Sequence, residues 1–141
     1  MDGLSTCPLC AREVGVTLWS DAFCRVIWVD DANYPGFCRV ILNAHVKEMT
    51  DLPADDRQRL MAVVFAVEAA VREVVQPDKI NLASLGNVVP HLHWHVIPRW
   101  ADDTNFPDAI WASARRPAAS RRLPADFRQQ LQVQIQERTQ A

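Results

Sequence analysis

Runs of apolar residues with two different spacings divide this chain into strands and helices. Two short runs, 26–29 and 37–42, are rich in β-branched and aromatic residues and predict neighbouring strands. Turn-forming residues fill positions 30–36 between them. From about Pro53 to Val75 the apolar residues follow helical spacing, with charged residues on the opposite side, so this segment predicts one long amphipathic helix.

The segments around this helix complete an apparent core. We expect Thr50 or Asp51 to cap the start of the helix and Pro77 to end it. The remaining parts of the core are a strand from about Ile80, an irregular stretch at 86–87 and an extended stretch at 90–99. Strands, then one long helix, then strands is the order typical of an α+β domain, with the helix on one face of an antiparallel sheet.

Beyond position 99 the sequence changes character. Residues 102–124 show no sustained period and are rich in Pro, Ala and Arg, which predicts a long loop or an extended arm. Pro124 then opens a predicted final helix. The apolar face of that helix would comprise Phe127, Leu131 and Ile135. We expect a core domain over residues 1–100, with the arm and helix of 101–141 belonging to the same single domain.

Composition and charge narrow the function classes. A chain of 141 residues that is 49% hydrophobic and 23% charged is typical of a globular protein, and its net charge of −2 argues against a general nucleic-acid binder with a basic surface. No apolar stretch approaches the roughly 20 residues that cross a membrane. The first six residues carry no basic leader, so we expect a cytoplasmic protein whose four cysteines are thiols or metal ligands.

Three of the four histidines occupy every second position of one decapeptide, as His91, His93 and His95. In an extended chain successive side chains point to opposite faces, so these imidazoles would project together. The intervening residues, which would point the other way, are Leu92, Trp94 and Val96. Imidazole can act as a base, a nucleophile or a metal ligand near neutral pH, whereas a row that only packed would leave several ring nitrogens unpaired. The row therefore predicts a chemically active surface.

A second group with metal-binding chemistry lies at the N-terminus. Cys7 and Cys10 have the spacing that lets two thiolates bind one tetrahedral ion. A redox dithiol shares this spacing but normally opens a helix after a strand, for which the preceding six residues leave no room. The further ligands would come from His45 and one member of the histidine row, and spacing does not choose among them. Cys24 and Cys38 lie inside apolar runs and are expected to be buried thiols.

Residues 86–99 closely resemble the signature of the histidine triad (HIT) superfamily, in which three alternating histidines are usually preceded by Gly-Gln and followed by Pro-Arg. The stretch from Gly36 to His45 resembles the glycine-started strand of that family, which ends in a histidine. Cys7 and Cys10 resemble the cysteines of its zinc-containing branch. The resemblance covers about residues 7–100 and implies an α+β fold with a HIT-like antiparallel sheet.

The resemblance implies a ligand set for zinc. In the zinc-containing members the two cysteines, the histidine that closes the glycine-started strand and the first histidine of the row share one ion. Carried over, these are Cys7, Cys10, His45 and His91. Four protein ligands leave no open position, so such a zinc would be structural.

The same resemblance assigns catalytic roles. His93 would be the nucleophile that attacks an α-phosphorus, with a backbone carbonyl holding its other nitrogen, and water would hydrolyse the nucleotidyl-histidine. His95 would hydrogen-bond the phosphate and the bridging atom. The nucleotidyltransferase branch carries glutamine at that position, so His95 favours hydrolysis, which requires no organic cofactor.

Four further positions are expected to bind substrate. Asn81 resembles the family asparagine that touches phosphate, and Asp30, with Asp31 as a competing choice, resembles the carboxylate that binds ribose. Both matches need a gap of one residue. Asn87 stands where the family has glutamine, and Val88 stands where a hydroxyl residue often follows. A missing donor there would slow catalysis or change the preferred leaving group.

The leading hypothesis is a nucleotide hydrolase acting on nucleoside phosphoramidates or dinucleoside polyphosphates. One alternative is a metal-dependent hydrolase whose histidine row holds a catalytic ion, and another is a nucleotide-binding module without turnover. HIT proteins are commonly homodimers in which C-terminal segments reach the neighbouring site. The aromatic residues of the arm could cover such a partner or substrate, or pack on their own domain. They are Trp100, Phe106 and Trp111.

Overall fold

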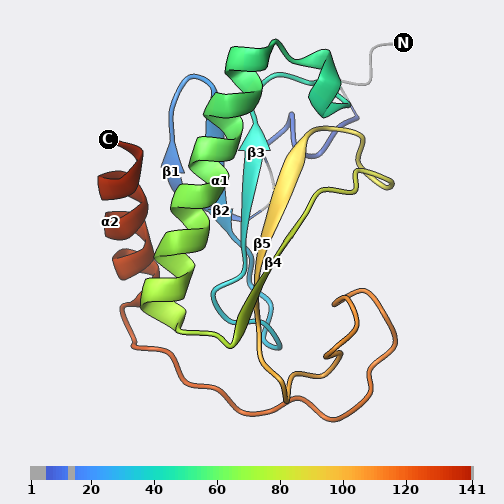
Figure 1. Cartoon of the computed structure of the whole chain (residues 1–141), viewed down its shortest axis with the longest axis vertical. Coiled ribbons are helices and arrows are strands. Elements are labelled where there is room, and N and C mark those ends of the chain that lie inside the picture. Colours follow the sequence, from blue (N-terminus) through green and yellow to red (C-terminus); the bar gives the residue numbers. More distant parts are fainter. Residues whose placement is uncertain (1–5, 13–14, 141) are drawn as a thin grey trace.

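A computed structural model of the chain describes residues 6–12 and 15–140. The leader expectation rests mainly on residues 1–5, which lie outside those ranges. The elements in order are β1 (Val16–Ser20), β2 (Cys24–Trp28), β3 (Cys38–Leu42), the 3-10 turn η1 (Met49–Asp51), α1 (Ala54–Val75), β4 (Lys79–Ala83), β5 (His93–Arg99) and α2 (Phe127–Thr139). Figure 1 shows the two helices beside the sheet.

The five strands form one sheet in the order β1-β2-β3-β5-β4, and every neighbouring pair is antiparallel. Helix α1 packs across β3 and β5, and α2 packs on α1 and β1. Both helices contribute to one buried cluster on the same face of the sheet. The α+β fold with a long helix on one face is therefore confirmed, and β5 lies between β3 and β4.

The strand predicted at 90–99 begins only at His93, so His91 precedes it. Strand β1 was not predicted, although Val16 to Trp19 has the β-branched and aromatic composition of a strand. Only one of its five side chains, Leu18, is buried, and its pairing with β2 is interrupted by an irregularity. A short edge strand of this kind carries a weak hydrophobic pattern.

The prediction of a side-chain cap on α1 was wrong. Thr50 and Asp51 lie in η1, and the N-cap is Pro53, whose carbonyl accepts a bond from the amide of Arg57. Acidic residues in the first turn of α1 instead favour its positive end. At the other end Gln76 adopts a left-handed conformation (φ 53°) just before Pro77, so the predicted end of the helix is confirmed.

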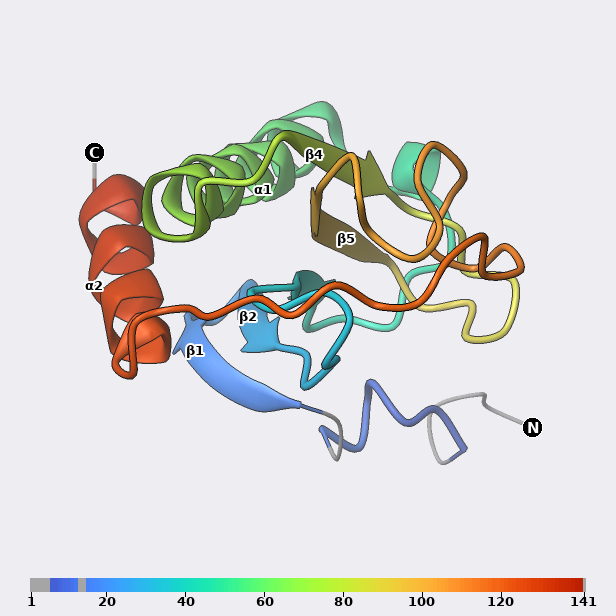
Figure 2. The same ribbon diagram turned by 90° about the horizontal axis from the view of Figure 1, so that it is seen from below.

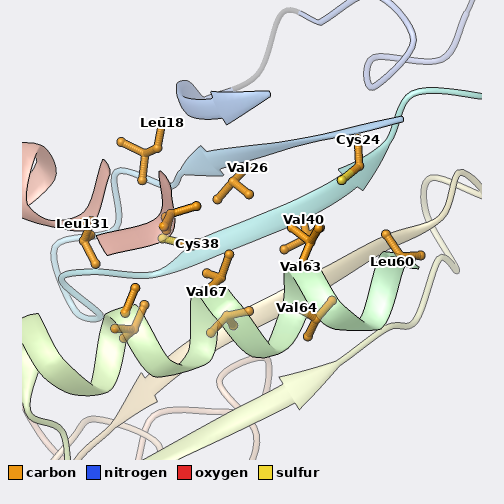
Figure 3. Close-up of a cluster of buried hydrophobic side chains, with 14 of the residues drawn as sticks. Leu18, Cys24, Val26, Cys38, Val40, Leu60, Val63, Val64, Val67 and Leu131 are labelled. Atoms are coloured by element: carbon orange, nitrogen blue, oxygen red, sulfur yellow. The ribbon is translucent and has the colours of Figure 1, made fainter. Parts of the chain in front are cut away.

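The main core lies between α1 and the sheet. Figure 3 shows Val67 of α1 in this cluster with Val26 of β2 and Val40 of β3. The apolar residues that alternate with the histidines also pack in or against this cluster, which confirms the predicted alternation. They are Leu92, Trp94 and Val96. Cys24 and Cys38 are fully buried, and burial raises the pKa of each thiol to about 12, as expected of packing thiols.

The arm after β5 contains no helix or strand before α2, as predicted, but it is firmly attached to the core. The Arg99 guanidinium makes two hydrogen bonds to the Asp103 carboxylate, at 2.8 and 3.0 Å, and each of the two residues is 2% exposed. Tyr34 donates a hydrogen bond to Asn105 of the arm. In Figure 2, which is seen from below, the arm crosses in front of the sheet toward α2. The side chains of Leu131 and Ile135 on α2 are buried.

Candidate functional site

The sheet face opposite α1 collects the residues with reactive side chains. Strand side chains alternate, so when Trp94 and Val96 enter the core, His93 and His95 point to the other face. The antiparallel register places Arg39 of β3 opposite His95 and Ile41 opposite His93. The same register explains why His95 and Arg39 touch, because directly opposed residues lie on the same face of a sheet.

Four predicted metal ligands meet at one end of this face. The ligand atoms of Cys7, Cys10, His45 and His91 all lie within 4.8 Å of one another. The Nδ1 atoms of the two histidines are 3.2 Å apart, and Cys10 Sγ is 3.2 and 3.3 Å from them. A tetrahedral zinc site has ligand-to-ligand edges of about 3.3 to 3.8 Å. Two sulfurs and two nitrogens at these separations fit a single zinc ion.

The surroundings of His91 prepare it as a ligand. Its Nε2 lies 2.6 Å from the carbonyl oxygen of Leu42, which can only accept, so Nε2 carries the proton and the Nδ1 lone pair faces the cysteines. Burial lowers the pKa of His91, which favours the neutral ring that metals bind. The guanidinium of Arg25 donates to the carbonyl of Leu9 at 2.8 Å and thereby holds the segment between the two cysteines.

His93 has the ring orientation that a nucleophile needs. Its Nδ1 lies 2.6 Å from the carbonyl oxygen of His91, so Nδ1 must donate its proton and Nε2 is left with a lone pair. Burial, with a further contribution from the Arg39 cation, lowers the pKa of His93. The neutral ring is the nucleophilic form of imidazole.

His95 lies beside His93, with ring centroids 4.9 Å apart and planes at 79°. Its Nδ1 accepts a hydrogen bond of 3.2 Å from Nε of Arg39, and its ring contacts Phe37 and Trp111. Burial is the main cause that lowers the pKa of His95 to about 3, with the His93 ring and the Arg39 cation adding to it. His95 is therefore neutral near pH 7.

A cavity of about 510 Å³ opens over His93 and His95. Its lining includes two of the predicted substrate residues, Asn87 and Val88, and the side chain of Val88 is 93% exposed. The other lining residues are Pro8, Leu9, Arg39, Leu85, Gly86, Val89 and Trp111. The cavity thus combines an apolar wall with two imidazoles and one cation, and a mostly apolar lining with a few polar groups is typical of small-molecule sites.

The other two predicted substrate residues lie elsewhere. Asn81 is on the same face as His95 but accepts a 2.7 Å hydrogen bond from Arg99, and it lines an adjacent cavity of about 350 Å³. Asp30 is exposed and lines neither cavity. The competing choice, Asp31, interacts with a residue of the cavity wall, because its negative charge acts to raise the pKa of Arg39.

Sequence reasoning did not assign Arg39 a role, and it left that of Trp111 open. A charged residue inside the apolar run 37–42 was the available signal for Arg39, but its partner depends on strand register, which is not a local property. Trp111 projects from the arm onto His95, with ring centroids 5.0 Å apart, and borders both cavities. The other aromatics of the arm pack on their own chain, Trp100 beneath Arg121 and Phe106 beside Arg99.

Comparisons with known proteins show which proteins this chain resembles. Two AP-4-A phosphorylase sequences from Mycobacterium tuberculosis strains are 32% identical to this chain over 85 residues, which is 56% of this chain and 44% of each relative. The chain thus spans less than half the length of these curated relatives. A histidine triad protein from Marinobacter aquaeolei has 27% identity and a TM-score of 0.72, covering 86% of this chain and 89% of that one.

A zinc-bound histidine triad family protein from Mycobacterium smegmatis shares the fold, with 22% identity, a TM-score of 0.67 and 96% coverage of both chains. The family model for the HIT domain matches residues 15–102, which include β1 to β5 and all three histidines of the row. Because that match covers well over half of its 141 residues, this chain belongs to the HIT domain family.

Proposed function

We propose that this protein is a nucleotide hydrolase that forms a nucleotidyl-histidine on His93. The observation that carries the proposal is the 2.6 Å contact between Nδ1 of His93 and the His91 carbonyl, which leaves the Nε2 lone pair free in the cavity beside His95. A nucleophile must hold its reactive lone pair in the correct tautomer before the substrate arrives. His93 meets that requirement.

The reaction has two steps. Nε2 of His93 attacks the α-phosphorus, a phosphorus–nitrogen bond forms, and the bond to the leaving group breaks with its electron pair going to that group. A polyphosphate leaves as the anion, and an amine takes up a proton from solvent as it leaves. The Nε2–H of His95 hydrogen-bonds the phosphate and the bridging atom as charge develops there. Water then attacks the same phosphorus, and the phosphorus–nitrogen bond breaks with its electron pair returning to Nε2, so that His93 is again neutral. One proton of the water goes to solvent and the other stays with the oxygen that joins the released nucleotide.

The substrates we propose are nucleoside phosphoramidates or dinucleoside polyphosphates, bound with Asn87 and Val88 at the cavity wall. Asn81 and Asp30, predicted to contact phosphate and ribose, are proposed as substrate contacts with less structural support, because neither lines the cavity over His93. The name of the Mycobacterium tuberculosis relative favours a second candidate reaction, in which inorganic phosphate rather than water takes the nucleotidyl group.

Intact-mass spectrometry of rapidly quenched protein tests the proposal. The protein is mixed with adenosine phosphoramidate or diadenosine tetraphosphate, with and without inorganic phosphate, beside His93→Ala. We expect an adduct of one adenylyl group that is absent from the variant. ADP as a product only when phosphate is added would favour the second reaction. No adduct and no product from either substrate would support the binding module instead.

The arrangement of the row also bears on the metal-dependent alternative. Nδ1 of His91 faces the two cysteines and His45, whereas Nδ1 of His93 is engaged by a carbonyl and Nδ1 of His95 by Arg39. A catalytic ion held by all three imidazoles would need them to converge. These contacts favour the nucleophilic reaction, and the two proposals differ in whether chelation stops turnover at once.

We propose that Cys7, Cys10, His45 and His91 hold one structural zinc ion. The ion would fasten the N-terminal segment to the sheet and contribute directly to folding stability. The variant Cys10→Ser should then contain much less than one zinc ion per chain and should melt several degrees below the wild type. The loss of one ligand weakens zinc binding and, through it, the stability of the fold. Elemental analysis and thermal unfolding measure the two effects.

Cys24→Ala is the matched control for the zinc experiment. Cys24 is fully buried but lies outside the ligand cluster, so its removal should lower the melting temperature and leave the zinc content unchanged. Zinc stoichiometry in Cys10→Ser equal to that of the wild type would contradict the proposed site.

Three expectations remain predictions. The homodimer implied by the resemblance is tested by the mass of the particle in solution. The cytoplasmic location is tested by cell fractionation. The division into a core over 1–100 with the arm and helix of 101–141 in the same domain predicts a single cooperative unfolding transition.

None of the helices in ranges 6–12 and 15–140 has the length and apolarity needed to cross a membrane.

A further inference from the structure

Arg39 lies on the sheet face that holds His93 and His95, and the mechanism proposed above gives it no role. Its Nε lies 3.2 Å from Nδ1 of His95. Arginine has five N–H donors, no acceptor and a permanent charge, so Arg39 must donate in this contact and Nδ1 of His95 must accept. The proton of the neutral His95 ring is therefore on Nε2, where it can be donated to a substrate.

The remaining nitrogens of the Arg39 guanidinium have no hydrogen-bond partner among residues 6–12 and 15–140. Its Cζ lies 5.4 Å from the centre of the Phe37 ring, and the group is half-buried in the wall of the cavity. Within the part of the chain that the structure describes, Nη1 and Nη2 of Arg39 make no hydrogen bond or ion pair. Burial lowers the pKa of Arg39, and the charge of Asp31 only partly opposes that effect. A desolvated cation with free donors is a binding site for an anion.

The chemistry of the leaving group decides what such a cation does. Cleavage of a phosphoanhydride releases a polyphosphate on which negative charge increases, and a fixed guanidinium stabilises that charge through paired hydrogen bonds. Cleavage of a phosphoramidate releases an amine that must take up a proton, and a nearby cation disfavours the resulting ammonium. Val88 brings no hydroxyl to this cavity, and among the described residues that line it Arg39 is the one with a permanently charged donor.

We propose that Arg39 determines specificity: it holds His95 with its proton on Nε2 and binds leaving-group phosphates, so that polyphosphate leaving groups are preferred over amines. This inference rests on the proposed hydrolase function, because it concerns the leaving group of that reaction. It selects dinucleoside polyphosphates from the two substrate classes named above. Arg39 is a binding residue for the leaving group and a positioning residue for His95.

The decisive measurement is the ratio of kcat/KM for diadenosine tetraphosphate to that for adenosine phosphoramidate. Arg39→Met should lower kcat/KM for the tetraphosphate by about 10- to 100-fold, the size expected for lost charged hydrogen bonds, and change that for the phosphoramidate much less. Arg39→Lys, which keeps a point charge, should recover part of the ratio. Arg59→Met is the matched control, because Arg59 pairs with Asp21 at the surface and should leave the ratio unchanged.

Two further readouts separate this inference from the proposed function. Binding of inorganic tripolyphosphate, measured by calorimetry, needs no turnover and should weaken about tenfold in Arg39→Met. Ring ¹⁵N shifts of His95 should indicate a proton on Nε2 in the wild type and a mixture of tautomers in Arg39→Met. Equal losses on both substrates, or unchanged tripolyphosphate binding in a variant that melts normally, would overturn the proposal. A wild type that binds tripolyphosphate through Arg39 yet turns over neither substrate would contradict only the hydrolase.

Discussion

Replacing His93 by alanine should reduce turnover by about 10⁴-fold or more while the protein stays folded and binds nucleotide. Removing the nucleophile from a covalent mechanism leaves only the binding and electrostatic contributions to the rate. His93 is partly exposed in the cavity, and its Nδ1 donates to the backbone carbonyl of His91. Within residues 6–12 and 15–140 its ring makes no hydrogen bond to another side chain, so its removal leaves no side chain without a partner. The loss should therefore fall on the chemical step rather than on stability.

The control for this experiment is His95→Ala, which removes the proposed hydrogen-bond donor but leaves His93, the proposed nucleophile, in place. We expect a smaller reduction, about 10²- to 10³-fold, typical of one lost transition-state donor. A second check is His93→Gly with added imidazole, which can enter the vacated space and restore part of the turnover. Near-normal turnover in both His93 variants would refute the nucleophile assignment.

Replacing Asp103 by asparagine should lower the free energy of unfolding by about 3 to 5 kcal/mol, because it leaves the buried Arg99 cation without its counter-charge. The carboxylate also accepts hydrogen bonds from the amides of Trp100, Asn105 and Phe106 at the start of the arm. An asparagine in its place can satisfy only some of these donors. In Asp103→Asn the start of the arm, and with it the contact of Trp111 with His95, should therefore be less firmly held.

Acid should reproduce part of this loss in the wild type. Burial acts to raise the pKa of Asp103, but the hydrogen bonds from Arg99 and from backbone amides outweigh it and lower the value from 3.8 to about 2. A carboxylate whose pKa is lower in the folded state than in the unfolded state stabilises the protein fully when the pH is above its unfolded-state pKa. This stabilisation is lost as the pH falls through the folded-state pKa. The contribution, about 2 kcal/mol, is therefore present above about pH 4 and lost as the pH falls toward 2.

Urea unfolding at pH 7 and at pH 3 measures both effects. Asp102→Asn is the matched control, since Asp102 pairs with Arg121 at the surface and its side chain is 68% exposed. Exposed pairs contribute about 1 kcal/mol or less, so that variant should resemble the wild type. A loss below about 1 kcal/mol at pH 7 in Asp103→Asn would show that the buried pair does not stabilise the fold.

Local patterns predicted the parts of the fold that depend on local spacing. The period of two around His93 placed the apolar and ionisable side chains on the correct faces, and the helical period located α1 to within about a residue. Residue chemistry made His45 a candidate ligand beside Cys7 and Cys10, and the resemblance then selected His91 from the histidine row. The four ligands lie tens of residues apart in the sequence, and they meet only when the sheet has folded.

What the sequence could not supply depended on register and on tertiary packing. Arg39 is opposite His95 only because β3 and β5 are neighbours in one particular alignment. Trp111 reaches the site because the buried pair of Arg99 and Asp103 fixes the start of the arm. The cap of α1 was misassigned because the preceding residues form a 3-10 turn, which competes with side-chain capping and is not visible in residue types.

The two-sided character of β5 restricts how this protein can change in evolution. One inserted or deleted residue between His93 and Arg99 would exchange the two faces of the strand beyond that point, moving imidazoles into the core and core residues into the cavity. Point substitutions keep the faces apart, but a change in length does not. Insertions and deletions should therefore be confined to the connections on either side, such as 84–90 and 104–124, where added chain alters the walls of the cavity without disturbing the strand that holds His93 and His95.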